Sequence, residues 1–284
     1  MRFFGQAWQR VVALAGLAAM LLVASMVVPV PAQAQEGGAT LEWFGWSHFR
    51  ITSMNGKVIL INPFIEGNPD AAIGVDDLTK VDLILVADAH NDELGSTIAI
   101  AQKTNAMTFA AGGGLNGWML EQGLPATQIA QRFAQPGNLY KMDGISVRML
   151  NAVHGSEIGK PTAQNPYGGT AASFMVTLEN GYTIYFQGSS AATADMALWA
   201  EMYKPDAMIF HMSGQHDPLD VAMSIRLMMT NNPNLKTLMP HHHRIQVPAG
   251  QTTTADVQAA MAQLGVAPMA ITEQTRSQVY PLTK

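Results

Sequence analysis

Short apolar segments along the chain predict strands and helices from about residue 41 to the C-terminus. Strands are expected where apolar residues alternate or run continuously over a few positions, at residues 41–44, 49–53, 57–61, 82–86, 107–110, 145–150, 173–178, 182–186, 206–210, 236–239 and 278–282. Helices are expected at residues 95–102, in a short segment ending near 121, and at 193–202, 220–229 and 254–264. Turn signals such as Asn55-Gly56 and Asn180-Gly181 separate neighbouring strands.

The order of these elements predicts an α/β fold. Strand meanders come first, and strands alternate with helices in the C-terminal third. This order is typical of two β-sheets packed together with helices on their outer faces. The chain shows no internal repeat and no low-complexity tract, so one folded domain is expected over residues 35–284.

The first 34 residues have the pattern of a secretory signal. Arg2 and Arg10 give a basic start, residues 11–30 are apolar, and Pro31-Ala32-Gln33-Ala34 offers a small-x-small cleavage site. Cleavage after Ala34 would release a periplasmic or secreted domain. The apolar run is also long enough for an uncleaved inner-membrane anchor, which would be the protein's one expected contact with a membrane.

Charge and cysteine content exclude several classes of function. The chain has 16 basic and 21 acidic residues, and both Arg2 and Arg10 lie in the predicted signal, so the mature domain has a formal net charge of −7. A nucleic-acid partner is therefore not expected, because binding phosphates needs a basic face. The absence of cysteine excludes disulfides and thiolate metal ligands. A small-molecule substrate is expected instead.

Histidines and carboxylates follow several of the predicted strands. His90, His154, His211 and the run His241–His243 each come shortly after one, and the first is accompanied by Asp88, Asp92 and Glu93. Polar residues at the ends of neighbouring strands converge in layered α/β folds. Imidazole and carboxylate together bind divalent ions such as zinc, manganese or iron. One or two such ions are expected, and they would generate hydroxide from bound water near neutral pH.

The chain resembles the metallo-β-lactamase superfamily, and within it the lactonase-type branch that contains ascorbate-6-phosphate lactonases. Residues 87–93 (Ala-Asp-Ala-His-Asn-Asp-Glu) correspond to the family motif Thr-His-x-His-x-Asp-His after a buried strand. Other matching segments, in order, are residues 44–47, 61–63, 151–156, 184–190, 204–206 and 239–243. The resemblance covers about residues 40–245 and implies an αββα sandwich of two mixed sheets with helices on the outer faces.

The resemblance also implies which residues hold metal. The first ion would be bound by Asp88, His90 and His154. The second would be bound by Asp92, Glu93 and His242, with the position of a bridging carboxylate at Ser189. Asp92 would also orient the attacking water or accept its proton.

Three metal-site positions depart from the family pattern. Asp88 and Glu93 stand where the family has histidines, and Ser189 stands where it has the bridging aspartate. Asn62 and Trp46 also replace an aspartate and a common histidine. The additional carboxylates shift the expected preference from zinc toward manganese, iron or magnesium.

Two hypotheses of function follow. One is an exported metal-dependent hydrolase that attacks an ester, lactone or phosphoester by metal-bound hydroxide, with Ser189, His211 and His216 available for substrate or as extra ligands. The other is a non-catalytic member of the fold with a degenerate metal site that acts as a binding protein. Simpler interpretations also stand, in which Asp92 caps a helix starting near Gly95 and His241–His243 form a surface loop.

Overall fold

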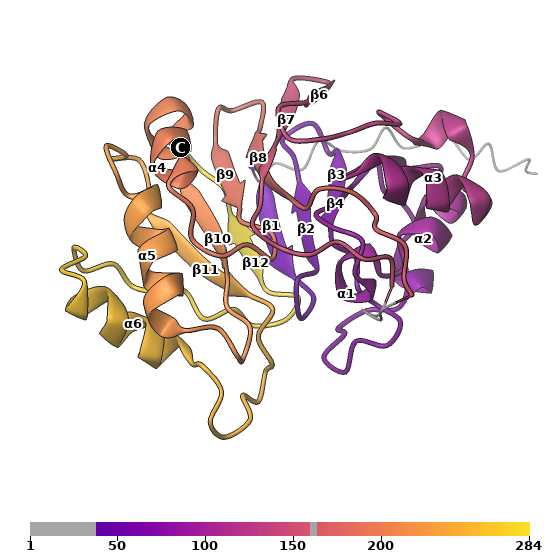
Figure 1. The fold of residues 1–284 in the computed structure, drawn as a ribbon. Coiled ribbons are helices and arrows are strands. Elements are labelled where there is room, and N and C mark those ends of the chain that lie inside the picture. Colours follow the sequence, from indigo (N-terminus) through magenta and orange to yellow (C-terminus); the bar gives the residue numbers. More distant parts are fainter. Residues whose placement is uncertain (1–37, 160–163) are drawn as a thin grey trace, which may run out of the picture. The chain divides into compact units, whose positions relative to one another are not determined.

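Two six-stranded β-sheets face each other in the computed structural model, which describes residues 38–159 and 164–284 (Figure 1). The strands of the first sheet, in spatial order, are β12 (Val279–Pro281), β1 (Thr40–Trp43), β2 (Phe49–Thr52), β3 (Val58–Ile61), β4 (Leu83–Val86) and β5 (Met107–Ala110). Those of the second are β11 (Thr237–His241), β10 (Ala207–His211), β9 (Thr183–Phe186), β8 (Ala172–Thr177), β7 (Ile145–Asn151) and β6 (Leu139–Met142).

Both sheets are mixed. The β1–β2–β3 meander is antiparallel, whereas β4 runs parallel to both β3 and β5. In the second sheet β7, β8 and β9 are antiparallel neighbours, and β10 runs parallel to β9 and β11. The carboxyl ends of the parallel strands therefore meet at one edge of the sandwich, where polar loop residues converge.

Helices cover the outer face of each sheet (Figure 1). They are α1 (Asn91–Leu94), α2 (Thr97–Thr104), α3 (Gly113–Glu121), α4 (Asp195–Tyr203), α5 (Pro218–Met228) and α6 (Thr254–Gln263), together with the short 3-10 helices Val75–Asp77 and Ala126–Gln128. Buried residues of α2 and α3 pack on the first sheet, and those of α4, α5 and α6 pack on the second. This is the αββα sandwich expected from the sequence.

The main core lies between the sheets. Fully buried side chains from both inner faces form one apolar cluster, for example Phe49 on β2, Phe174 on β8 and Phe186 on β9. Phe49 and Phe186 meet edge to face across the sandwich, with ring centroids 6.1 Å apart. Alternating inward side chains from two sheets are what a sandwich requires, and this core holds the strand ends in fixed positions.

One short helix was not expected. The helix predicted at residues 95–102 is α2, but it is preceded by the separate helix α1, which starts at Asn91 with His90 at its N-cap. Asp92 lies inside α1, so the interpretation of Asp92 as a cap for a helix near Gly95 is wrong. Gly95 instead ends α1, with φ at +48°, and a Cβ there would lie 2.4 Å from the Pro63 carbonyl oxygen. Only glycine fits this turn.

The last strand before the histidine run is longer than predicted, because β11 includes Pro240 and His241. Its register with β10 pairs His211 with His241. Proline is tolerated there since β11 is the edge strand of its sheet. The simpler interpretation of all three histidines as a surface loop is therefore wrong for His241. Strand β6 was not expected, and its partly exposed residues explain the weak apolar signal.

The predicted signal peptide, residues 1–34, lies outside the described residues and stays a prediction. Within residues 38–159 and 164–284, no helix combines the length and the apolar character needed to cross a membrane.

Candidate metal centre

The ends of five strands bring the candidate ligands together. The segment after β4 carries Asp88 and His90, and α1 follows it directly. The loops after β7, β9 and β11 carry His154, Ser189 and His242. The amide oxygen of Asn62, which follows β3, accepts the backbone N–H of Ala87 at 2.9 Å and so fixes the start of the motif segment.

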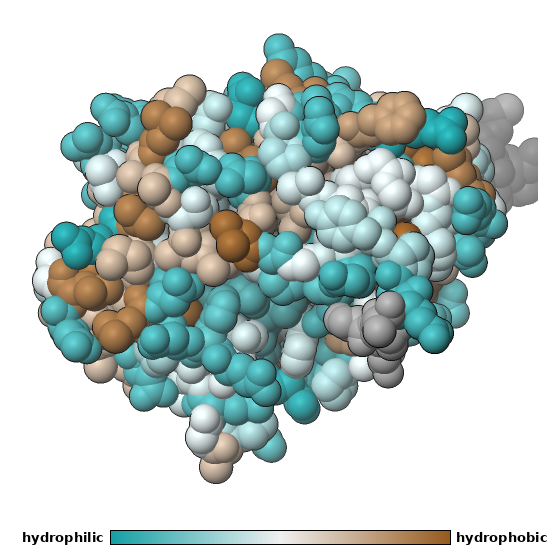
Figure 2. All heavy atoms as spheres, in the orientation of Figure 1, coloured by the Kyte–Doolittle hydropathy of each residue, from teal (hydrophilic) through white to brown (hydrophobic). Residues whose placement is uncertain are grey.

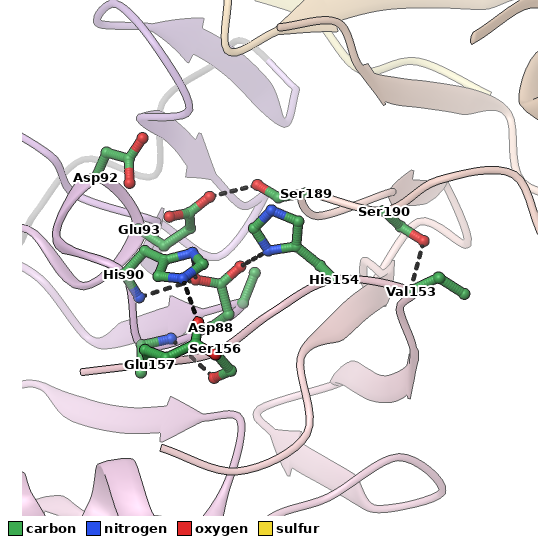
Figure 3. A network of polar contacts seen from close by, with 12 residues as sticks. Asp88, His90, Asp92, Glu93, Val153, His154, Ser156, Glu157, Ser189 and Ser190 are labelled. Atoms are coloured by element: carbon green, nitrogen blue, oxygen red, sulfur yellow. Dashed lines mark hydrogen bonds and ion pairs between the residues drawn. The ribbon is translucent and has the colours of Figure 1, made fainter. Parts of the chain in front are cut away.

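Asp88, His90 and His154 form the first donor group, with one possible ligand atom from each within 4.8 Å of the others. Asp88 lies between the two imidazoles (Figure 3). Its carboxylate oxygens are 3.1 Å from Nδ1 of His154 and 3.4 Å from Nδ1 of His90. Burial alone would lower the pKa of His154, but the hydrogen bond to Asp88 and the charge of Asp88 raise it overall. The expected first set of ligands is therefore assembled in space.

Glu157 adds a carboxylate that the sequence analysis did not single out. Its Oε2 lies 3.0 Å from Nε2 of His90, whereas Asp88 is nearest Nδ1 of the same ring (Figure 3). A carboxylate that accepts one imidazole N–H fixes the tautomer and leaves the other nitrogen free for a metal. The hydrogen bond to His90 lowers the pKa of Glu157, which keeps it ionised. The signal that could have found it is an acidic residue on the loop just after His154.

Asp92, Glu93 and His242 form the second donor group, again with ligand atoms within 4.8 Å of one another. Nε2 of His242 is 2.7 Å from Oε1 of Glu93 and 3.7 Å from Oδ2 of Asp92. His242 adopts a left-handed backbone conformation, with φ at +63°. That turn directly after β11 aims its ring back at α1, while the neighbouring His241 stacks on Phe186 in the core. Of the three consecutive histidines, His242 is the one in a donor group.

Ser189 lies at the second group, where the resemblance expects a bridging carboxylate. Its hydroxyl donates a short hydrogen bond to Oε1 of Glu93 and is 3.3 Å from Nε2 of His242. A neutral hydroxyl supplies no negative charge between two ions. The second group is therefore held together by Ser189, but it lacks the bridging anion.

Trp46 also takes part in the second group, through an indole N–H that donates to Oδ2 of Asp92 at 3.0 Å. Ser47 donates to the backbone oxygen of Asp92 at 3.0 Å. Burial acts to raise the pKa of Asp92, but the nearby His242, a hydrogen bond with Glu93 and the Trp46 indole lower it overall. Asp92 is thus an oriented, ionised carboxylate.

His211 lies beside both donor groups without belonging to either. Its ring centroid is 6.3 Å from that of His154 and 5.0 Å from that of His242, and His216 lies 4.2 Å away on its other side. In the described part of the chain, Nδ1 of His211 and Nδ1 of His216 are buried and have no hydrogen-bond partner. Burial lowers the pKa of both, that of His211 strongly. Their predicted role, as substrate contacts or extra ligands, stays a prediction.

The charges of the two groups fit a divalent cation. Burial, followed by the negative charges of Asp88 and Asp92, raises the pKa of Glu93 well above its usual range. Oε2 of Glu93 is buried and has no hydrogen-bond partner among the described residues. Burial also lowers the pKa of His242 to about 4, so its imidazole is neutral, as metal binding requires. A cation would supply the positive charge that these buried carboxylates lack.

The comparisons with known proteins agree with this geometry. Residues 40–235 match the family model for the β-lactamase superfamily domain. The chain belongs to the metallo-β-lactamase superfamily. The resemblance drawn from the sequence is thereby confirmed at the level of the superfamily, and the lactonase-type branch stays a prediction.

Relatives within the superfamily are named metal-dependent hydrolases. A UPF0173 metal-dependent hydrolase of Cupriavidus taiwanensis is 35% identical over 209 residues, which are 69% of this chain and 72% of that protein. One of Polynucleobacter asymbioticus is 31% identical over 276 residues, covering 90% of this chain and 93% of that protein. These relatives support a divalent metal and leave its identity open.

Solved structures of other proteins share the fold. Igni18, a metallo hydrolase from Ignicoccus hospitalis, superposes with a TM-score of 0.68 at 21% identity, covering 86% of this chain and 99% of that chain. An isothiocyanate hydrolase from Delia radicum gut bacteria has a TM-score of 0.64 at 17% identity, covering 86% of this chain and 100% of that one. At such identities the likeness extends to the fold alone.

Proposed function

We propose that the protein is an exported metal-dependent hydrolase that attacks an ester, a lactone or a phosphoester. The observation that carries the proposal is the pair of donor groups, Asp88–His90–His154 and Asp92–Glu93–His242, at one edge of the sandwich. The two groups are close enough for the charge of Asp88 to raise the pKa of Glu93. Such proximity supports a centre of one ion, or of two adjacent ions.

The donors favour an ion that accepts oxygen ligands. Three carboxylates and three imidazoles are present, with no thiolate in the chain. This set suits manganese or iron at least as well as zinc. When bound, a divalent ion lowers the pKa of a coordinated water molecule and polarises the carbonyl or phosphoryl group under attack.

The side chains around the donors would position the reactants. Asp92, held by the Trp46 indole and ionised, can accept a hydrogen bond from the attacking water and take up its proton. His211 is buried and neutral, so it can donate or accept one hydrogen bond toward a substrate without adding charge.

Metal analysis followed by hydrolysis assays tests this proposal. The purified protein would be reconstituted with manganese, iron or zinc and assayed against generic esters, lactones and phosphodiesters. Asp92→Asn is the informative variant, because it keeps an oxygen near Trp46 but removes the charge that accepts a proton. We expect it to keep an ion at Asp88, His90 and His154 and, when compared with the wild type at saturating metal, to lose at least about 100-fold in kcat, as general-base loss implies. A wild-type protein that binds metal and hydrolyses none of these substrates would overturn the proposal.

One observation favours a second candidate, a non-catalytic binding protein. Ser189 replaces the bridging anion and engages Glu93 instead, which weakens a two-ion centre. A protein that holds one ion, binds a small ligand and shows no turnover would support this alternative.

Export is proposed from the sequence alone. The basic start, the apolar run and the cleavage site before Gln35 support a periplasmic or secreted location. Fractionation of expressing cells, with N-terminal sequencing of the recovered protein, tests it. A mature chain that still begins at Met1 would contradict cleavage after Ala34.

A further inference from the structure

A cavity of about 270 Å³ opens beside the second donor group. Its lining includes Trp46 and His242, which also take part in the second donor group, together with Ser213, Gln215, Gln251 and Arg244. No acidic residue is among the described residues that line it, and Arg244 is the cation there.

Arg244 is held in a fixed orientation by one edge of its guanidinium. Its Nε donates to Oδ2 of Asp70 at 2.6 Å, and the backbone N–H of Ile245 reaches the same oxygen at 3.3 Å. Within the described residues, no hydrogen bond or ion pair uses the two terminal nitrogens of Arg244. Arginine has five N–H donors in a rigid plane, so four remain for another partner.

A second arginine lies beside Asp70. Nη1 of Arg276 donates to the backbone oxygen of Asp70 at 3.2 Å. The Asp70 carboxylate pairs with Arg244, and Arg276 adds a second positive charge next to the same residue. On its other side Arg244 borders a cavity lined by Glu273. Of these two cavities that Arg244 borders, the one shared with His242 has no acidic residue among the described residues of its lining.

We infer that this cavity is a subsite where Arg244 binds an anionic group of the substrate, and that this group is a carboxylate. The inference rests on the proposed function and specifies its substrate class. Because His242 and Arg244 line the same cavity, one small molecule can contact both. A monoanionic carboxylate fits better than a dianionic phosphate, since Asp70 and the donor carboxylates repel the second charge. The substrate would then be an ester or lactone that carries a carboxylate apart from its scissile bond.

Calorimetric titration of the purified protein with small dicarboxylates, in the presence of manganese, tests the subsite directly, because one carboxylate can then face the donor groups and the other can face Arg244. Malonate, succinate, glutarate and adipate sample different spans, and glutaramide is the neutral counterpart of glutarate. We expect at least one dicarboxylate to bind the wild type, and Arg244→Gln to weaken it by about 10-fold or more, as loss of a charged hydrogen-bond pair implies. Glutaramide should be insensitive to the substitution.

Two further variants separate binding from folding. Arg226, exposed on α5 and away from this cavity, gives the matched control Arg226→Gln, which should bind like the wild type. Arg244→Lys keeps a cation for Asp70 and should lose only part of the affinity, because the planar fork is gone. Equal affinity of the wild type and Arg244→Gln, or no binding of any dicarboxylate by the wild type, would overturn the subsite.

The same samples distinguish this inference from the proposed function. Tighter binding of phosphonoacetate than of malonate would overturn the choice of a carboxylate. The metal content and the ester hydrolysis of the wild type are measured on the same samples. If the wild type fails to retain metal or to hydrolyse esters, the proposed function is refuted by these two readouts alone. The dicarboxylate comparison then still decides the subsite.

Discussion

Replacing Glu93 by glutamine should have opposite effects on the metal-free and the metal-loaded protein. Without metal, the raised pKa of Glu93 means that its folded pKa lies above the unfolded value of 4.5. Such a group stabilises the fold below pH 4.5, and this contribution is lost as the pH rises through the folded pKa. Glutamine is neutral at every pH and similar in shape. Metal-free Glu93→Gln should therefore be as stable as the wild type at low pH and more stable above neutral pH.

With metal the order should reverse. Glu93 offers an anionic ligand next to His242. Loss of this charge is expected to weaken metal binding by about 100-fold, which is the upper end of the loss found when residues hydrogen-bonded to metal ligands are replaced. At a fixed metal excess, a 100-fold weaker Kd removes about 2.7 kcal/mol of stabilisation. For a domain of this size, that corresponds to about 5–10 °C in Tm. The metal-induced rise in Tm should be smaller by this amount in the variant.

Thermal unfolding in chelator and in excess manganese measures both effects in one experiment. Glu201→Gln, on the exposed side of α4, is the matched control and should follow the wild type in both conditions. If Glu93→Gln were less stable than the wild type by the same amount with and without metal, Glu93 would be a structural hydrogen-bond partner of Ser189. That result would refute the argument that it is a ligand.

Four other substitutions, the last compared with a control variant, give further tests. Glu157→Gln should weaken metal binding by about 10- to 100-fold, measured by calorimetry, because it no longer fixes the His90 tautomer; unchanged affinity would contradict this role. Ser189→Asp should raise the affinity for a second ion, measured as metal content per chain, and an unaltered content would show that Ser189 is not at the bridging position. Burial, with a smaller effect of Arg50, lowers the pKa of His48 to about 3, whereas its unfolded value is 6.5. The contribution of neutral His48 to stability is therefore present above pH 6.5 and is lost as the pH falls toward 3. His48→Phe should therefore reduce the slope of unfolding free energy against pH in this window by up to about 1.4 kcal/mol per pH unit, measured by denaturant unfolding. Gly95→Ala should destabilise by about 3 kcal/mol or more, because its Cβ meets backbone, whereas Gly56→Ala, with positive φ but open space, should cost about 1 kcal/mol.

The fold was predictable because its signals are local. The buried strands β4 and β10 are continuous apolar runs, and the Asn180-Gly181 turn specifies the β8–β9 hairpin directly. The start of α1 was not predictable from residue patterns, since a four-residue helix has no periodicity to detect. Its position depends on the close packing of Gly95 against Pro63, a contact between distant segments. Strand β6 was missed for a similar reason, because an edge strand with partly exposed residues carries a weak apolar pattern.

Part of the candidate site was also predictable from the sequence, and part was not. Asp88, His90 and His154 follow strands, so their convergence could be expected from strand order. The contact of Glu157 with His90 could not, because it depends on how one loop folds back across the motif. The same is true of Arg244, whose orientation is set by Asp70 from a loop far away in the sequence. The order of the strands therefore predicts the position of the site, whereas the contacts of Glu157 and Arg244 depend on how distant loops pack together.

The three departures from the family pattern at the metal positions together change the net charge of the site. Asp88 and Glu93 add two carboxylates where the family pattern has neutral imidazoles, and Ser189 removes one where the pattern has a bridging aspartate. The site therefore gains one negative charge, and the added carboxylates lie in different donor groups. Because Glu93 is buried and its pKa is raised, the additional negative charge destabilises the fold unless a cation is present or Glu93 takes up a proton. The carboxylate-rich site consequently couples metal retention to pH, since protons and the metal compete for the same buried oxygen atoms.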